Sequence, residues 1–200
     1  MNEQNILIAS VGGQGGLTLS KIMANAAVRA GFSVRTGETL GMAQRGGSVQ
    51  SFVRIGQEVR SPLFSQGTAD ALLAFEGVEA VRSSPYIKKD ALVLVDPVVK
   101  QSITTLTKKE KYPSQEELLS VLRARSCNVH VVEALKEATS LDSPKSANLY
   151  MLGMFCSLTG LLPSEAVERA IDDVLGKRGQ LALEVFRSGI ARGASMSRDR

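Results

Sequence analysis

The sequence has little of what many cofactor sites are built from. It contains no tryptophan, one histidine and two cysteines in 200 residues, and aromatic residues make up 4%. The cysteines, Cys127 and Cys156, lie far apart, without a CxxC spacing or a Cys/His partner. Because an iron–sulfur cluster or a structural zinc needs about four such ligands, we expect no metal site within this chain alone.

Basic clusters and long apolar runs are also missing. The net charge of +4 is mild, and no basic cluster interleaved with aromatics, typical of nucleic-acid binding, is present. The longest apolar stretch, residues 149–162, is interrupted by small residues and is too short for a bilayer. The polar start is followed at once by an apolar strand, unlike a signal peptide. We therefore expect no nucleic-acid or membrane partner and a cytoplasmic location.

The sequence offers no recognisable catalytic group. His130, the only histidine, lies in a predicted strand over 128–132, where we expect a structural role. No Ser–His–Asp or Cys–His arrangement can be assembled around it. We therefore expect no catalytic residue in this chain alone.

A glycine-rich turn stands between an apolar run, residues 6–11, and a stretch with helical periodicity, residues 17–30. Glycine adopts positive φ at little steric cost, so the backbone can turn sharply from strand to helix. The first N–H groups of the helix can then meet an anion, assisted by the helix dipole. The candidate cofactor-binding positions are Gly12, Gly13, Gln14 and Gly15. The alternative is that these glycines serve only close strand–helix packing.

Apolar runs and breakers along the rest of the chain predict one α/β domain. Further strands are expected over 32–36, 70–75, 91–95 and 128–132, and helices over 76–84, 114–125 and from 147 onward. A strand over 48–55, a turn at Gly56 and a return over 58–60 predict a β-hairpin. We expect a Rossmann-like three-layer α/β domain with a mainly parallel sheet, this inserted hairpin, C-terminal helices and a flexible tail over 193–200.

Polar residues follow several predicted strands. Glu38 and Arg45 follow the second strand, and Glu76 and Asp96 follow the next two buried ones. Ligands of a parallel sheet bind outside the carboxyl ends of its strands, so we expect these residues on one edge with the glycine turn. Asp96 also fits a strand-ending turn, and Glu38 fits the acid that binds a ribose in dinucleotide folds. Arg45 suits a phosphate or carboxylate, or is an exposed or partner-paired loop arginine.

Five segments together resemble a known family. They are NILIASVGGQGG near the start, GETLGMAQRGGSVQSFVRIG at 37–56, SPL at 61–63, ADALLAFEGVEAVR at 69–82 and SANLYMLG at 146–153. The chain resembles the gamma-type domain of 2-oxoacid:ferredoxin oxidoreductases, and within that family the beta subunits of the indolepyruvate type. The paired GGQG and GMAQRGG motifs at this spacing are more specific than either alone.

The resemblance implies a pyruvate/ketoisovalerate oxidoreductase gamma-type domain over 1–192 and a division of labour. Such enzymes oxidatively decarboxylate a 2-oxoacid, form an acyl-CoA and reduce ferredoxin. It implies that a large alpha subunit carries thiamine diphosphate, Mg and the iron–sulfur clusters, with CoA as co-substrate and no cofactor bound by this chain alone. The expected active-site or interface residues are Glu38, Gly41, Met42, Gln44, Arg45, Gly46, Gly47 and Asn148.

The same resemblance implies that this edge meets the alpha subunit near its thiamine site and receives the phosphates of CoA. Ser10 stands where the family often has glycine, and Gly16 stands where it has a bulkier residue. Two other hypotheses remain open from the residues. One is a free-standing NAD(P)-dependent dehydrogenase, based on the strand–glycine–helix start and Glu38. The other is a docking subunit without a part in the chemistry.

Overall fold

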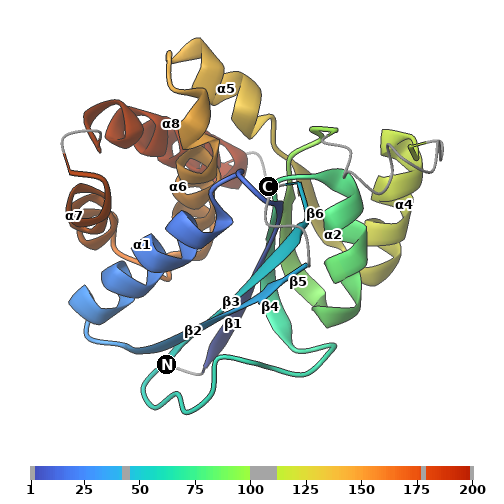
Figure 1. Cartoon of the computed structure of the whole chain (residues 1–200), viewed down its shortest axis with the longest axis horizontal. Helices are drawn as coiled ribbons and strands as arrows, with labels where there is room; N and C mark the ends of the chain where they lie inside the picture. The colour runs from blue at the N-terminus through green and yellow to red at the C-terminus, as the bar shows by residue number, and fades with distance from the viewer. Residues whose placement is uncertain (1–2, 42–45, 100–111, 177–178, 199–200) are drawn as a thin grey trace.

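The computed structural model describes residues 3–41, 46–99, 112–176 and 179–198. Within these ranges the chain forms a six-stranded sheet with helices on both faces (Figure 1). The strands are β1 (Gln4–Val11), β2 (Ser33–Leu40), β3 (Ser48–Gly56), β4 (Ala69–Ala74), β5 (Ile87–Val95) and β6 (Asn128–Val131). Their order across the sheet is β2-β3-β1-β4-β5-β6.

Helices form the two outer layers (Figure 1). On one face lie α1 (Gly16–Arg29), α6 (Ala147–Thr159), α7 (Ser164–Leu175) and α8 (Gly179–Arg198). On the other lie α2 (Gly77–Ser83) and α4 (Gln115–Arg125). The shorter elements are η1 (Ser84–Tyr86), α5 (Ala134–Ser140) and η2 (Pro144–Ser146). The predicted three-layer α/β class with C-terminal helices is confirmed.

Strand β3 runs against all the other strands of the sheet. Strands β1, β4, β5 and β6 pair in parallel in that order, whereas β3 is antiparallel to both β1 and β2. The carboxyl ends of β1, β2, β4, β5 and β6 therefore lie at one edge, together with the first residue of β3. This carboxyl edge is the upper one in Figure 1, opposite the N-terminus.

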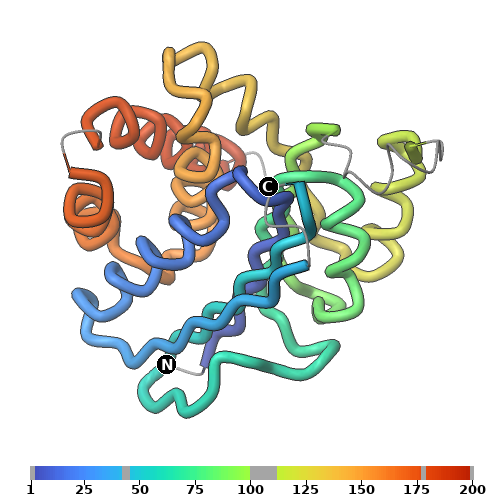
Figure 2. Tube along the Cα trace, in the orientation of Figure 1, coloured from blue at the N-terminus to red at the C-terminus, as the bar shows by residue number. Residues whose placement is uncertain are grey.

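The β-hairpin differs from the prediction. Residues 58–60 form no strand, and β3 pairs instead with β2, with Ser33 opposite Gly56 and Leu40 opposite Val49. The tube in Figure 2 shows β2 and β3 side by side. Strand β2 therefore covers residues 37–40, which the sequence predicts as loop. Because β2 is an exposed edge strand, its side chains need not alternate between apolar and polar. Its sequence therefore lacks the apolar pattern by which buried strands are predicted.

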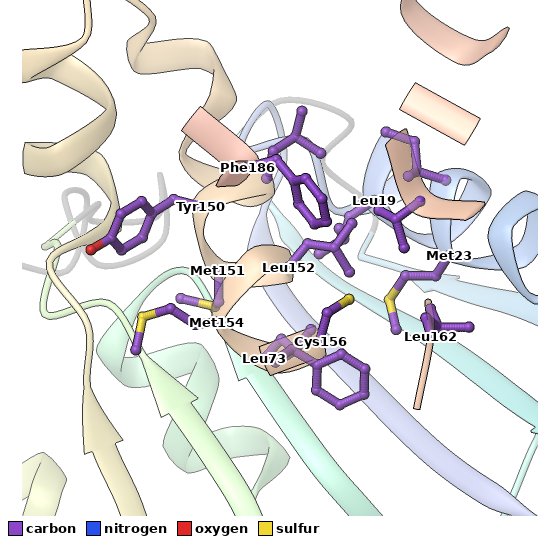
Figure 3. Packing of buried hydrophobic residues seen from close by; sticks show 14 of the residues in the cluster. Leu19, Met23, Leu73, Tyr150, Met151, Leu152, Met154, Cys156, Leu162 and Phe186 are labelled. Carbon is purple, nitrogen blue, oxygen red and sulfur yellow. The ribbon is translucent and has the colours of Figure 1, made fainter. Parts of the chain in front are cut away.

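Helix α6 is the centre of the larger core. All of its residues from 148 to 156 are buried, and Figure 3 shows its side chains packed among those of neighbouring elements. Two glycines let α6 and α8 touch backbone to backbone. A Cβ at Gly153 would meet the Phe186 carbonyl oxygen, and a Cβ at Gly189 would meet the carbonyl oxygen of Tyr150. This close packing fixes α6, and with it the first turn that carries Asn148.

The helices differ in how well the sequence predicts them. A capping box begins α4: Glu117 N donates to Ser114 Oγ at 3.2 Å, and Ser114 N donates to Glu117 Oε2 at 2.7 Å. The segment predicted as a flexible tail over 193–200 is helical as far as Arg198, and Gly193 is buried. Helix α5 was not predicted. No helix in the described ranges is both long enough and apolar enough to cross a bilayer.

Candidate functional site

The turn Gly12–Gly15 connects β1 to α1 through two left-handed residues. Gly13 has a φ of 97° and Gly15 a φ of 83°, a region that other residues rarely adopt. Gly15 caps α1 without any side-chain hydrogen bond, and its carbonyl accepts from Leu19 N at 3.0 Å. The N–H groups of residues 16–18 precede that bond and lie at the positive end of the helix dipole.

The Gln14 side chain fastens this turn on both sides. Its Oε1 accepts from Val11 N at 2.7 Å, and its Nε2 donates to the Phe75 carbonyl at 2.7 Å. Phe75 directly follows β4, and the chain leaves β1 and β4 toward opposite faces of the sheet. Gln14 therefore spans the switch point at which doubly wound folds commonly bind a ligand. Two hollows, described below, lie on either side of this side chain.

The second predicted motif comes to the same edge, because β2 ends and β3 begins there. Gly12 N donates to the Gly47 carbonyl at 2.8 Å, and Gly41 N donates to the Ser48 carbonyl at 2.9 Å. Gly46 is also left-handed, with a φ of 73°. The other predicted residues of this motif lie outside the described ranges: Met42, Gln44 and Arg45.

Asn148, the predicted residue of the third motif, also reaches the turn. Its Nδ2 donates to the Gly15 carbonyl at 3.1 Å across 133 residues of sequence. The Asn148 side chain is buried, and a Cβ added at Gly15 would lie 2.7 Å from its Nδ2. The structure thus brings the glycine turn, both described ends of the second motif and Asn148 into one place.

Helix α2 holds the start of β3, a connection that sequence reasoning missed. The Ser48 hydroxyl donates to Glu79 Oε2, and the other Glu79 oxygen accepts from Arg82 at 2.8 Å. Gln50 Nε2 donates to the Ser83 hydroxyl at 2.9 Å. The only sequence signal is that these three α2 residues fall on adjacent turns of a predicted helix. The two hydrogen bonds fix where the described end of the second motif lies.

Glu76 and Asp96 lie on the predicted edge, but each carboxylate binds the start of a helix. Glu76 caps α2 by accepting from Glu79 N at 2.8 Å, and it also accepts from the Tyr112 hydroxyl. Asp96 accepts from Leu135 N, at the start of α5, at 2.8 Å. Burial raises the pKa of Glu76 and raises the pKa of Asp96 to about 6. These bonds agree with the interpretation of Asp96 as a strand-ending residue.

Glu38 lies within β2 and faces α1. Its carboxylate accepts from the Ser20 hydroxyl at 3.2 Å. A dinucleotide fold places its second strand directly beside the first and parallel to it. In this chain β3 separates β2 from β1, so the arrangement that would bring Glu38 to a ribose at the glycine turn is not formed.

Two hollows flank the glycine turn. The hollow on the α1 side measures about 620 Å³ and is lined by Ser10, Gly16 and Thr18 among others. The hollow on the α5 side measures about 490 Å³, and its walls include Asp96 and Lys145. Each is large enough for part of a small-molecule ligand. The turn therefore presents its backbone to two separate spaces at the carboxyl edge.

The described residues do not fit a resident metal cluster. No group of three or more His, Cys, Asp or Glu side chains among them is arranged to hold a metal ion. Cys127 is exposed just before β6, and Cys156 is buried in α6. Burial raises the pKa of the Cys156 thiol to about 12, and metals bind the thiolate form. Cys156 is thus unsuited to cluster ligation.

The fold, and the contacts among the glycine turn, the second motif and Asn148, agree with the comparison to known protein families. The chain belongs to the pyruvate ferredoxin/flavodoxin oxidoreductase family, whose sequence model matches residues 5–192. The indolepyruvate oxidoreductase subunit IorB of Archaeoglobus fulgidus is 40% identical to it over 189 residues, 92% of each chain. The IorB subunit of Methanothermobacter thermautotrophicus is 34% identical over 192 residues, 95% of this chain and 97% of the relative. The family membership predicted from the sequence motifs is confirmed.

Solved structures share the fold. The gamma subunit of a keto/oxoacid ferredoxin oxidoreductase from Geobacter sulfurreducens superposes with a TM-score of 0.71 at 22% identity, covering 96% of this chain and 99% of that one. The 2-oxoglutarate:ferredoxin oxidoreductase of Magnetococcus marinus, solved with 2-oxoglutarate, coenzyme A and succinyl-CoA bound, gives 0.75 at 22% identity. This chain covers 32% of that longer one and matches it over 98% of its own length.

Proposed function

We propose that this chain is the small subunit of an indolepyruvate-type 2-oxoacid:ferredoxin oxidoreductase, with residues 1–192 as its gamma-type domain. The main support is the sequence identity of 34% and 40% to two IorB subunits, over more than nine-tenths of the chain. The complex takes an aryl 2-oxoacid and CoA, releases carbon dioxide and acyl-CoA, and passes the electrons to ferredoxin. We also propose that it works in the cytoplasm.

The larger partner subunit carries the thiamine diphosphate, the Mg ion and the iron–sulfur clusters in this proposal. Thiamine diphosphate supplies the carbanion chemistry of decarboxylation. The present chain contributes the glycine turn, residues 41–47 and Asn148, which bind and orient the substrates at the carboxyl edge. Its two cysteines, one exposed and one buried, support placing the clusters in the partner.

Co-expression tests this proposal. The chain is purified alone and with its large partner, and arylpyruvate- and CoA-dependent reduction of ferredoxin is measured. The lone chain is expected to be colourless and inactive, and the pair active. Oxoacid oxidation by the lone chain, or an iron–sulfur spectrum from it, would contradict the proposal.

A single substitution distinguishes two roles for this chain: a contribution to the active site, or docking to the large subunit alone. Arg45→Ala is expected to leave assembly intact while turnover falls by orders of magnitude, because a fixed guanidinium fork that holds an anion is lost. Arg60→Ala is the matched control, since Arg60 is an exposed arginine paired with Glu58. Unchanged turnover in an assembled Arg45→Ala complex would show that residues 41–47 serve docking only.

A further inference from the structure

A third hollow opens beyond the end of β6, away from the glycine turn. It measures about 440 Å³ and lies between the end of β6 and the helices α5, α6 and α8. None of the described residues that line it also lines either hollow beside the glycine turn. From α5 it takes Glu137, whereas the hollow beside the turn takes Leu135, which points to another side of that helix. The third hollow is therefore a separate space.

Tyr150 presents its hydroxyl to this hollow. The residue belongs to α6, is 4% exposed and is part of the lining. Figure 3 shows Tyr150 on the side of α6 away from Leu19 and Met23, with the hydroxyl at the outer end of the ring. Among the described residues this hydroxyl has no hydrogen-bond partner. A buried tyrosine hydroxyl usually has one, so this hydroxyl favours a partner that arrives with a ligand.

Two opposite charges line the same hollow without neutralising each other. Arg192 comes from α8 and Glu137 from α5. In the part of the chain that the structure describes, neither side chain forms an ion pair with the other or with any third residue. Glu133, the other acid in the lining, is already paired with Lys136. One guanidinium and one carboxylate are therefore left for a ligand.

Both of these charges lie near the Tyr150 hydroxyl. Burial raises the pKa of the phenol, the Glu137 carboxylate raises it further, and the Arg192 guanidinium lowers it. The phenol therefore keeps its proton at neutral pH, and its hydroxyl can donate a hydrogen bond. The hollow thus offers a carboxylate two donors, Tyr150 and Arg192, and offers a cation one acceptor, Glu137.

Apolar side chains complete the wall. They are Val131, Val132, Met154, Ala191 and Met196. Methionine adapts its shape to a ligand and makes favourable contacts with aromatic rings. A purely anionic ligand would be repelled by the acids of this hollow, and a purely cationic one by Arg192. A small zwitterion with an apolar side chain matches both charges and the wall, and the volume is sufficient for it.

We propose that this hollow is a binding site for a free α-amino acid with an apolar side chain. The carboxylate of the ligand accepts from Arg192 and from the Tyr150 hydroxyl, and its ammonium group donates to Glu137. Its side chain packs against Met154 and Met196. The inference goes beyond the proposed function and does not rest on it, because the site contains no residue of the glycine turn or the second motif.

Calorimetric titration of L-phenylalanine into the purified full chain is the first test. Binding with a Kd of about 1 mM or tighter is expected. Two analogues each lack one charge, since phenethylamine has no carboxylate and 3-phenylpropionate has no ammonium group. Each is expected to bind at least about tenfold more weakly, because one charge of the hollow is left unpaired. No binding of L-phenylalanine up to about 10 mM, or equal binding of all three, overturns the proposal.

Variants assign the two charges of the ligand. Arg192→Gln is expected to weaken the binding of L-phenylalanine about tenfold without weakening that of phenethylamine. Glu137→Gln is expected to do the same without weakening that of 3-phenylpropionate. Tyr150→Phe removes only the hydroxyl and should weaken L-phenylalanine binding by about fivefold. Arg187→Gln is the matched control, because Arg187 is an exposed arginine of α8 that pairs with Glu168 and does not line the hollow.

The other possible occupant of the hollow is the large subunit. In that case L-phenylalanine does not bind, and Arg192→Gln weakens assembly of the complex, which overturns the proposal. Equal loss of L-phenylalanine affinity in Arg192→Gln and Arg187→Gln also overturns it, because only one of these arginines lines the hollow. Thermal unfolding of each variant confirms that a lost affinity is not a lost fold.

Discussion

The Gln14 Nε2 donates to the Phe75 carbonyl at 2.7 Å across 61 residues of sequence. The same amide accepts from Val11 N through its oxygen, so it must be donor and acceptor at once. The bond joins the glycine turn after β1 to the end of β4. The shape of the turn therefore depends on an amide side chain as well as on its glycines.

Gln14→Glu is expected to lower the free energy of unfolding by about 1–3 kcal/mol at neutral pH. The carboxylate keeps an acceptor for Val11 N but places a second oxygen against the Phe75 carbonyl. Urea unfolding measures the loss, which should shrink at acid pH where glutamic acid can donate again. Gln57→Glu, at an exposed position, is the control. A Gln14→Glu protein as stable as wild type would mean that the bridge is not needed.

Gly15→Ala is expected to destabilise the protein more than Gly31→Ala. Both glycines are left-handed, with φ of 83° and 81°, so each alanine costs about 1 kcal/mol in backbone strain. A Cβ at Gly15 also lies 2.7 Å from Asn148 Nδ2, whereas nothing lies within 4 Å of one at Gly31. Thermal unfolding of both variants gives the comparison. Equal losses would mean that Asn148 moves aside freely.

Positions 10 and 16 are expected to be coupled in stability. Gly16→Ala should destabilise the wild type, because the new Cβ would meet Ser10 Oγ at 2.6 Å. The same substitution should cost markedly less in a Ser10→Gly background, where that space is vacated. A double-mutant cycle in urea measures the coupling. Additive effects of the two changes would contradict the contact.

Asp96 is expected to make stability fall as pH rises from about 4 to about 6. Burial raises the pKa of its carboxyl from 3.8 to about 6, so in that window the folded protein holds more protons than the unfolded chain. The difference corresponds to about 3 kcal/mol. Asp96→Asn can still accept from Leu135 N and cannot ionise.

The measurement for Asp96 is urea unfolding of wild type and Asp96→Asn across this pH range. The stability of the variant relative to wild type should rise with pH and level off above about pH 7. Other acids, such as Glu76, titrate in both proteins and cancel in the difference. Parallel pH curves for the two proteins would exclude a raised pKa at this carboxyl.

Gly153→Ala and Gly189→Ala are each expected to cost more than about 3 kcal/mol or to prevent folding. Each Cβ would meet a backbone carbonyl of the facing helix, which cannot turn aside as a side chain does. Gly179→Ala is the milder comparison, because its Cβ would lie 3.2 Å from Asp172 Oδ1, the end of a side chain that can turn aside. Circular dichroism and soluble yield measure the outcome, and a stable Gly153→Ala protein would show that α6 and α8 can separate.

Much of the fold is readable from the sequence because local signals and tertiary packing agree there. The buried strands β1, β4 and β5 are continuous apolar runs, and the Ser114/Glu117 box marks the start of α4. The strand–glycine–helix signal likewise gives the turn. Parallel strand ends then predict that Glu76 and Asp96 share its edge, which the structure confirms.

The remaining features depend on partners that a sequence does not reveal. Strand β2 is half exposed along its length, so its sequence has no regular pattern of apolar residues. Its strand conformation depends instead on pairing with β3. Helix α5 is seven residues long and has two buried residues, too few for a periodic signal. The Gln14 bridge and the Ser48–Glu79 bond join residues distant in sequence. Their residue types alone do not indicate these contacts.

The insertion of β3 between β1 and β2 has a consequence for how this family can diversify. It makes residues 12–47 one continuous cassette that begins and ends at the same edge, closed by the bond from Gly12 to Gly47. Such a cassette can be exchanged between relatives as a single graft. Asn148 and Ser10 would stay behind with the recipient, so both must match the donor's Gly15 and Gly16, which they contact.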